Sequence, residues 1–175
     1  MLVKRIVCTV EAHQRGSFHM AQMEWAALRT VEGFIAQLGG WDTSDTSIAY
    51  IYSLWENRDR YENFMENIHD DILGHSNQSA TYTSIKVELF EGEASGIAVN
   101  ELLRDCSLIR TSIIEREEKP LNIKQSDETL LFSDSTGGTL LFMRSETNGV
   151  PPWTVGETEE AFMITEDWFV HRNDM

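Results

Sequence analysis

His69 is the residue of this sequence whose type and setting could most directly support acid–base chemistry. It lies at the border of an apolar stripe, one helical turn from Met65 and Ile72, and Asp70 and Asp71 follow it directly. A histidine that faces a cavity beside a carboxylate can act as a general base near neutral pH. A histidine at the edge of a core, hydrogen-bonded to a nearby carbonyl, is the alternative interpretation, and the sequence leaves both open.

Metal ligation is not expected around His69. Glu66 and Asp70 point to the polar face of the predicted helix while His69 lies nearer its apolar face, so their donor atoms do not converge. Cys8 and Cys106 are too few and too far apart for a disulfide framework or a thiolate metal site. The sequence also lacks the HExxH, GxSxG and phosphate-loop motifs. We therefore predict no metal site.

Aromatic side chains of the first half could line an apolar pocket. The candidate substrate-binding residues are Trp25, Tyr52, Trp55 and Phe64. Such a set suits a flat apolar or aromatic ligand. Aromatic residues at helix or strand spacing are also ordinary core residues, and this interpretation stays open beside the first.

These residues fall on a predicted order of strand, helix, strand, strand, helix and strand. Apolar periodicity and turn residues place these elements at residues 1–10, 17–31, 34–41, 46–55, 57–73 and 82–90. Asn57 is a suitable N-cap for the second helix, and Gly74 is its predicted end. Gly39 and Gly40 predict a bulge or a close backbone approach. The order is that of an α+β, ferredoxin-like β-α-β-β-α-β domain.

The strand predicted at residues 46–55 carries apolar residues on both faces. One face should pack on the two helices, and the other needs cover that a second sheet would supply. We expect a face-to-face homodimer that completes a barrel, or an equivalent arrangement within the chain.

The second half of the chain is predicted to be a small β-rich module. Residues 91–96 are small and polar and indicate a linker, which gives two domains at residues 1–92 and 98–175. We predict a helical turn at 100–104 and strands at 107–115, 129–132, 139–144 and 161–171. The module could be an eroded second copy of the first fold.

The composition and net charge argue against some classes of function. The 175 residues are 41% hydrophobic and 25% charged, with a formal net charge of −15. An acidic surface repels phosphate backbones and anionic membranes, which argues against nucleic acid and membrane partners. No stretch is long and apolar enough to span a membrane, and the N-terminus lacks a signal-peptide pattern, so we expect a cytoplasmic protein.

The first half resembles the antibiotic-biosynthesis-monooxygenase-like superfamily of dimeric α+β barrels, and within it an uncharacterised bacterial branch. The resemblance covers residues 1–92 and rests on segments 25–28, 31–34, 39–41, 54–56, 61, 64–65 and 69–70. It implies a homodimer with a cavity between the sheet and helices of each subunit. It also implies a cofactor-free oxygenase for a small aromatic or polycyclic compound, with His69 as base and with Trp25, Tyr52 and Trp55 shaping the pocket.

Haem-degrading members of that superfamily offer a sharper comparison. They carry an asparagine on the first strand and a helical tryptophan followed ten residues later by a histidine ligand. Here the first strand has no asparagine, Phe64 replaces the tryptophan, and Gly74 stands ten residues on, with His75 one further. We therefore expect no cofactor, and haem degradation stays open as a third, disfavoured interpretation.

A second class of function fits the same fold, namely a non-enzymatic small-molecule binding or assembly protein. A closed apolar cavity that reaches His69 would favour the enzyme. A cavity filled by the protein's own side chains would favour the second class.

Overall fold

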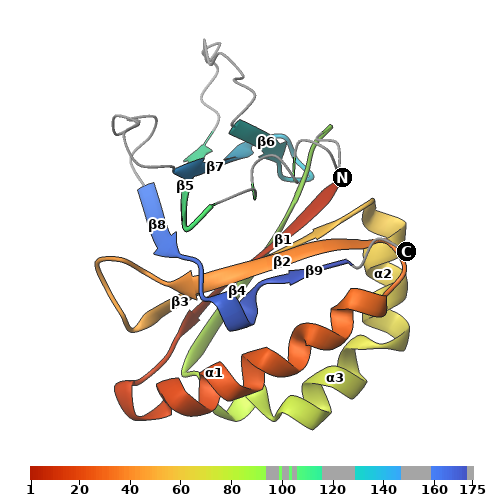
Figure 1. Cartoon of the computed structure of the whole chain (residues 1–175). Coiled ribbons are helices and arrows are strands. Elements are labelled where there is room, and N and C mark those ends of the chain that lie inside the picture. The colour runs from red at the N-terminus through yellow and green to blue at the C-terminus, as the bar shows by residue number, and fades with distance from the viewer. Residues whose placement is uncertain (94–98, 100–102, 104–105, 116–128, 147–158, 173–175) are drawn as a thin grey trace.

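Apolar segments of the first half form four long antiparallel strands (Figure 1). The computed structural model describes residues 1–93, 99, 103, 106–115, 129–146 and 159–172. The strands of the first half are β1 (Leu2–Thr9), β2 (Phe34–Trp41), β3 (Ile48–Trp55) and β4 (Ser84–Glu91). They lie side by side in the order β4-β1-β3-β2, as a ferredoxin-like sheet does. The predicted α+β fold is therefore confirmed.

The helices of the first half lie against one face of this sheet (Figure 1). The predicted helix at 17–31 consists of a 3-10 turn η1 (Ala12–Gln14), α1 (Arg15–Met23) and a second 3-10 segment η2 (Glu24–Thr30). The predicted helix at 57–73 is split by the non-helical backbone of Ile68 into α2 (Arg58–Asn67) and α3 (His69–Ser76). A short 3-10 turn η3 (Gln78–Ala80) follows.

The predicted start of the second helical segment is confirmed at α2, and its predicted end is wrong at α3. Asn57 caps α2, because its side-chain oxygen accepts a hydrogen bond from the backbone N–H of Arg60 at 2.9 Å. Gly74 does not end the helix but lies inside α3. The left-handed backbone that ends α3 belongs to Asn77, with φ of 50°, and asparagine tolerates this conformation better than most residues.

The second half contributes mainly strands. They are β5 (Leu108–Glu115), β6 (Thr129–Ser133), β7 (Thr139–Glu146), β8 (Glu159–Met163) and β9 (Val170–His171), with a 3-10 turn η4 (Glu166–Trp168) between the last two. The predicted single strand at 161–171 is thus wrong, since the chain turns at η4 to bury Trp168 beside Phe18 and Trp41. The predicted helical turn at 100–104 lies outside the described residues, apart from Leu103.

Within the described residues, nine strands form one sheet in the order β8-β5-β7-β6-β4-β1-β3-β2-β9. Its two outermost strands are consecutive in sequence, and Asp42 at the end of β2 forms an isolated bridge with Phe162 of β8. The backbone N–H of Thr165 also donates to the carbonyl oxygen of Gly39 at 2.9 Å. The sheet therefore folds back on itself within a single chain.

Gly39 and Gly40 allow this closure. A Cβ atom on Gly40 would lie 1.8 Å from the carbonyl oxygen of Met163, and one on Gly39 would lie 2.6 Å from that of Tyr50. The predicted close backbone approach is thus confirmed. The irregularity in β2 pairing lies elsewhere, between Phe34 and Ala36.

Strands β1–β4 form one part of this sheet, the first sheet. Strands β5–β7 lie over the face of the first sheet that carries no helices (Figure 1). The largest core cluster fills this space and joins residues of both halves, among them Val3, Tyr52, Phe90, Ile109, Leu141 and Phe162. Two other clusters lie between the sheet and the helices. The cover that β3 requires is thus supplied within the chain by the strands of the second half, and the homodimer stays a prediction.

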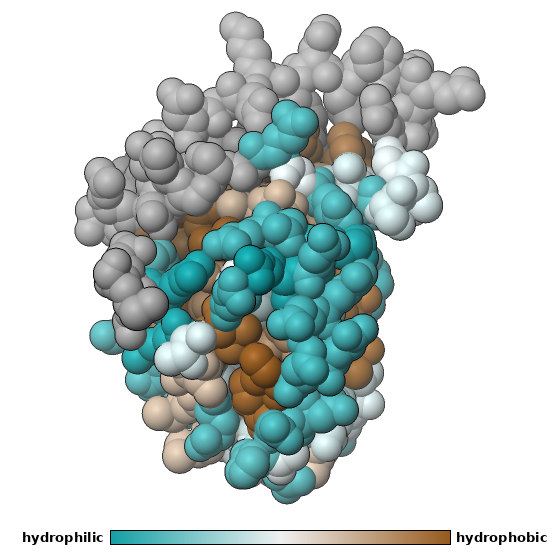
Figure 2. Space-filling model, turned by 90° about the vertical axis from the view of Figure 1, so that its right-hand side faces the viewer, coloured by the Kyte–Doolittle hydropathy of each residue, from teal (hydrophilic) through white to brown (hydrophobic). Residues whose placement is uncertain are grey.

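The surface on the side that carries α2 is mainly hydrophilic (Figure 2). A narrow stripe of apolar residues runs between hydrophilic flanks on this side. Within the described part of the chain, no helix has the length and hydropathy needed to cross a membrane.

Candidate functional site

A cavity of about 290 Å³ lies between the first sheet and the helices. Most of its wall is apolar, including Ile6, Cys8, Leu28, Ile51, Met65 and Leu73. β4 contributes Ile85 and Val87 to the wall, and both residues are about half exposed. The cavity is therefore a mainly apolar space bounded on the side of β4 by residues that solvent reaches.

Four of the five predicted site residues lie around this cavity: Trp25, Trp55, Phe64 and His69. The rings of Trp55 and Phe64 are stacked, with centroids 4.8 Å apart. Trp25 comes from η2, Trp55 from β3, Phe64 from α2 and His69 from α3. The arrangement of strand, turn and helices thus brings together residues far apart in the sequence.

Tyr52 is not brought to the cavity. Successive strand residues point to opposite faces of a sheet, so Tyr52 points away from the helices that Ser53 and Trp55 of the same strand face. Its ring stacks on Phe162 at 5.6 Å, and its hydroxyl lies 3.0 Å from the Thr111 hydroxyl. Tyr52 therefore belongs to the contact between the two halves.

His69 borders the cavity with a carboxylate behind it. Its Nδ1 lies 2.9 Å from Oδ1 of Asp70, and its side chain is 15% exposed. Its ring centroid is 5.6 Å from that of Trp25 and 5.7 Å from that of Phe64. When Nδ1–H donates to the carboxylate, Nε2 is the basic nitrogen of the ring. This geometry is suited to proton transfer.

A chain of hydrogen bonds fixes the indole of Trp25. Its Nε1–H donates to Oε1 of Gln78 at 2.7 Å, and Nε2 of Gln78 donates to Oε1 of Gln22 at the same distance. All three side chains are buried and border the cavity. The chain holds the tryptophan in one orientation, and sequence reasoning missed both glutamines because neither belongs to a recognisable motif.

Lys4 is the most unusual residue of the cavity wall, and sequence reasoning missed it. It is 8% exposed, and its Nζ lies 3.9 Å from Sδ of Met65 and 5.6 Å from the centroid of the Tyr61 ring. Among the described residues, no carboxylate pairs with it. Burial lowers the pKa of Lys4 to about 8, because an apolar environment disfavours the charged ammonium.

Two further polar residues, Ser53 and Gln37, are buried in the same wall. The Ser53 hydroxyl oxygen accepts a hydrogen bond from Nε1 of Trp55 at 3.2 Å. Nε2 of Gln37 is buried and has no hydrogen-bond partner within the described residues. The cavity thus contains donor groups as well as apolar surface.

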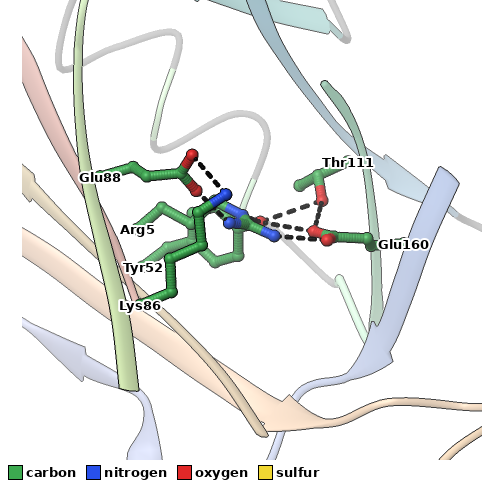
Figure 3. A network of polar contacts seen from close by, with 6 residues as sticks. All are labelled: Arg5, Tyr52, Lys86, Glu88, Thr111 and Glu160. Atoms are coloured by element: carbon green, nitrogen blue, oxygen red, sulfur yellow. Dashed lines mark hydrogen bonds and ion pairs between the residues drawn. The ribbon is translucent and has the colours of Figure 1, made fainter. Parts of the chain in front are cut away.

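A second polar cluster lies on the opposite face of the sheet (Figure 3). The Arg5 guanidinium forms ion pairs with Glu88 and Glu160, and its Nε donates to the Tyr52 hydroxyl at 3.1 Å. Burial by itself would lower the pKa of Arg5, but Tyr52 and Glu160 outweigh it and raise the pKa above its ordinary value. The cluster joins β1, β3 and β4 to β5 and β8 through paired groups, so we assign it a structural role.

Metal ligation has no evident place in the described ranges. No three histidine, cysteine, aspartate or glutamate side chains there come together as a metal site requires.

The family model described as "Domain of unknown function (DUF4937)" matches residues 2–90. The uncharacterised protein YdbC of Bacillus subtilis (strain 168) is 45% identical over 93 residues. This alignment covers 52% of the present chain and 78% of YdbC. The family model thus matches the half of the chain that contains the cavity.

Two solved structures match nearly the whole chain. A protein of Lactobacillus acidophilus NCFM, provisionally named a monooxygenase, has a TM-score of 0.64 at 11% identity and covers 98% of this chain and 96% of its own. An anthrone oxidase-like protein has a TM-score of 0.59 at 10% identity, covering 99% and 94%. These likenesses confirm the resemblance to the antibiotic-biosynthesis-monooxygenase-like superfamily at the level of the fold.

Proposed function

The chain belongs to the DUF4937 family, and on that premise we propose that it is an oxygenase-like enzyme for a small aromatic compound. The observation that carries this proposal is the apolar cavity of about 290 Å³ that reaches His69. The cavity is bordered by aromatic side chains and is not filled by them. The names of the structural neighbours, a provisional monooxygenase and an anthrone oxidase-like protein, support the same class.

The cavity volume sets the size of the proposed substrate. Ligand pockets in proteins measure about 300 to 1,000 Å³, so this cavity is near the lower end. An engineered protein cavity of about 150 Å³ holds benzene. A volume of about 290 Å³ therefore favours a compound of about two fused rings over a larger polycycle.

The proposed chemistry needs a base, an apolar pocket and a stabilising donor. Nε2 of His69 takes a proton from a ring hydroxyl or from an activated ring C–H. The resulting anion is electron-rich enough to reduce O2 and to form a C–O bond with it. Protonation gives a hydroperoxide, which loses water to leave a carbonyl, so one oxygen atom enters the product and the other enters water.

Haem is not part of this proposal. Gly74 has no side chain to offer, and Nδ1 of His75 is hydrogen-bonded to the backbone carbonyl oxygen of Asp71. His75 is also absent from the wall of the cavity. The proposal keeps a cofactor-free reaction in a homodimer, as the resemblance implies, and the cytoplasmic location expected from the sequence.

The test is oxidation of naphthols and dihydroxynaphthalenes, followed with an oxygen electrode and with mass spectrometry of products formed under isotopically labelled dioxygen. We expect His69→Ala to lower turnover by about 10²- to 10⁴-fold with little change in ligand affinity. His75→Ala, an exposed histidine on the same helix, is the matched control. Oxidation that is no faster than the uncatalysed reaction would contradict the proposal, and ligand binding without turnover would favour the non-enzymatic binding protein.

A further inference from the structure

Three polar residues of the cavity wall form one row across the sheet. Lys4 of β1 is paired with Ser53 of β3, and Ser53 is paired with Gln37 of β2. Residues directly opposite each other on neighbouring strands point to the same face, with Cβ atoms about 5 Å apart. All three side chains line the cavity.

Each member of the row can donate a hydrogen bond into the cavity. The Lys4 ammonium has donors and no acceptor. Nε2 of Gln37 is buried and unpartnered within the described residues. The Ser53 oxygen already accepts from Nε1 of Trp55, which leaves the hydroxyl hydrogen free to donate. Sδ of Met65, a weak acceptor, takes one N–H of Lys4 at 3.9 Å. The remaining donors of the row are not satisfied by the described part of the protein.

The fold gives no reason for such a row. A buried donor without an acceptor destabilises a protein, as does a buried ammonium without a carboxylate. The neighbouring residue Arg5 is equally buried but has Glu88, Glu160 and Tyr52 as partners. The missing partner of the row is thus explained if a ligand supplies it.

The opposite wall of the cavity indicates what else the ligand contains. Trp25, Phe64 and His69 face the cavity from the helices. The aromatic rings of Trp25 and Phe64 both contact the His69 ring. A ligand that satisfies both walls has an oxygen acceptor at one edge and an apolar ring system elsewhere.

We infer that Lys4, Ser53 and Gln37 together bind an oxygen acceptor of the ligand, namely a carbonyl, an ionised hydroxyl or a carboxylate on an aromatic ring. This inference deepens the proposed function, because it uses the same cavity and names the substrate class, but it requires no turnover. In the proposed reaction, the row would hold the substrate oxygen on the sheet while His69 faces the ring system from the helices.

The test compares three two-ring probes in the absence of oxygen: 2-naphthoate, 2-naphthol and naphthalene. Binding is measured near neutral pH by quenching of tryptophan fluorescence and by calorimetry. We expect the wild-type protein to bind 2-naphthoate at least about tenfold more tightly than naphthalene. We expect Lys4→Met to abolish this preference while leaving the affinity for naphthalene within about twofold.

Two further variants keep the test decisive if Lys4→Met does not fold. Gln37→Leu should reduce the preference by about two- to tenfold. Lys86→Met removes the same charge from an exposed position of β4, outside the cavity, and should leave the affinity for every probe unchanged.

Equal wild-type affinities for 2-naphthoate and naphthalene would overturn the inference. An equal fall in the affinities for 2-naphthoate and naphthalene in Lys4→Met would also overturn it, as would the failure of every probe to bind. A preference for oxygenated probes without oxidation would leave the inference standing and refute the oxygenase. Oxidation without that preference would refute the inference alone.

Discussion

Lys4 and Arg5 are consecutive residues of β1 whose charged groups lie on opposite faces of the sheet. Arg5 is paired with Glu88 and Glu160 between the two halves of the chain. Lys4 meets the ring of Tyr61 and the sulfur of Met65 beside the cavity. One buried charge thus joins the halves of the protein, and the other is available to a ligand.

Replacement of Lys4 should stabilise the protein. A folded-state pKa of about 8, against an ordinary value of 10.5, corresponds to roughly 3 kcal/mol of unfavourable burial near neutral pH. We expect Lys4→Met to raise the free energy of unfolding near neutral pH by about 1–3 kcal/mol, measured by urea denaturation. Lys86→Met, at an exposed position, should change it by less than about 0.5 kcal/mol.

The stability gained by Lys4→Met should depend on pH. Between pH 8 and 10.5 the unfolded chain still holds the Lys4 proton while the folded protein has lost it, so the Lys4 contribution to stability rises with pH. Burial also raises the pKa of Cys8 to about 12, which acts in the opposite direction in both proteins. The difference between wild type and variant should therefore shrink across this window, and a constant difference would contradict a buried, titrating Lys4.

Removal of Arg5 should have the opposite effect on stability. Arg5→Met leaves Glu88 and Glu160 without their shared partner, and breaking a buried ion pair in this way costs about 3–5 kcal/mol. Glu160→Gln should cost less, because an amide can still bond to the hydroxyls of Tyr52 and Thr111. Urea denaturation of both variants measures the difference.

Arg58→Met is the control for the Arg5 variants. Arg58 pairs with Glu91 at a partly exposed position, where ion pairs contribute about 0–1 kcal/mol. An equal loss of stability in Arg58→Met and Arg5→Met would contradict the structural role assigned to the buried cluster.

The addition of one methyl group at Gly40 should disturb the contact between β2 and β8 that closes the sheet. Its Cβ would lie 1.8 Å from the carbonyl oxygen of Met163, so Gly40→Ala must displace β8 from β2. We expect a loss of at least about 2 kcal/mol in the free energy of unfolding. Gly16→Ala is the control, because no atom lies within 4 Å of its added Cβ and alanine favours the helix by up to about 1 kcal/mol.

Filling the cavity should separate ligand binding from folding. Ile51 is buried and borders the cavity, so the larger ring of Ile51→Phe can occupy existing space. We expect probe affinity to fall by more than about tenfold while the free energy of unfolding changes by less than about 1.5 kcal/mol. Met20→Phe, at an exposed position outside the cavity, should change neither quantity. Unchanged affinity in Ile51→Phe would place the ligand elsewhere.

Sequence periodicity was sufficient to predict the strands of the first sheet and much of the candidate site. Helix and strand phase placed Trp25, Phe64 and His69 on faces that point to the sheet, and the cavity lies there. Tyr52 was misplaced because β3 is apolar on both faces, so alternation alone does not say which face meets the helices. The single strand predicted at 161–171 failed because nothing local shows that Trp168 packs on Phe18.

The donor row could not be predicted from the sequence. Lys4 is in phase with Ile6 and Cys8, which is a visible local signal. Its neighbours Ser53 and Gln37 lie on other strands, and their alignment depends on the pairing register. Register is a property of the assembled sheet, so the cluster emerges from the fold.

The return of the chain to β2 has a consequence for synthesis on the ribosome. Trp168 packs with Phe18 and Trp41, and β9 pairs with β2, although Trp168 and β9 are translated more than 70 residues after β4, the last strand of the first half. Until these residues emerge, the nascent first half has an unpaired strand edge and an open gap in its core, a state prone to aggregation. Completion of the half that contains the cavity is thus deferred until Trp168 and β9 have left the ribosome.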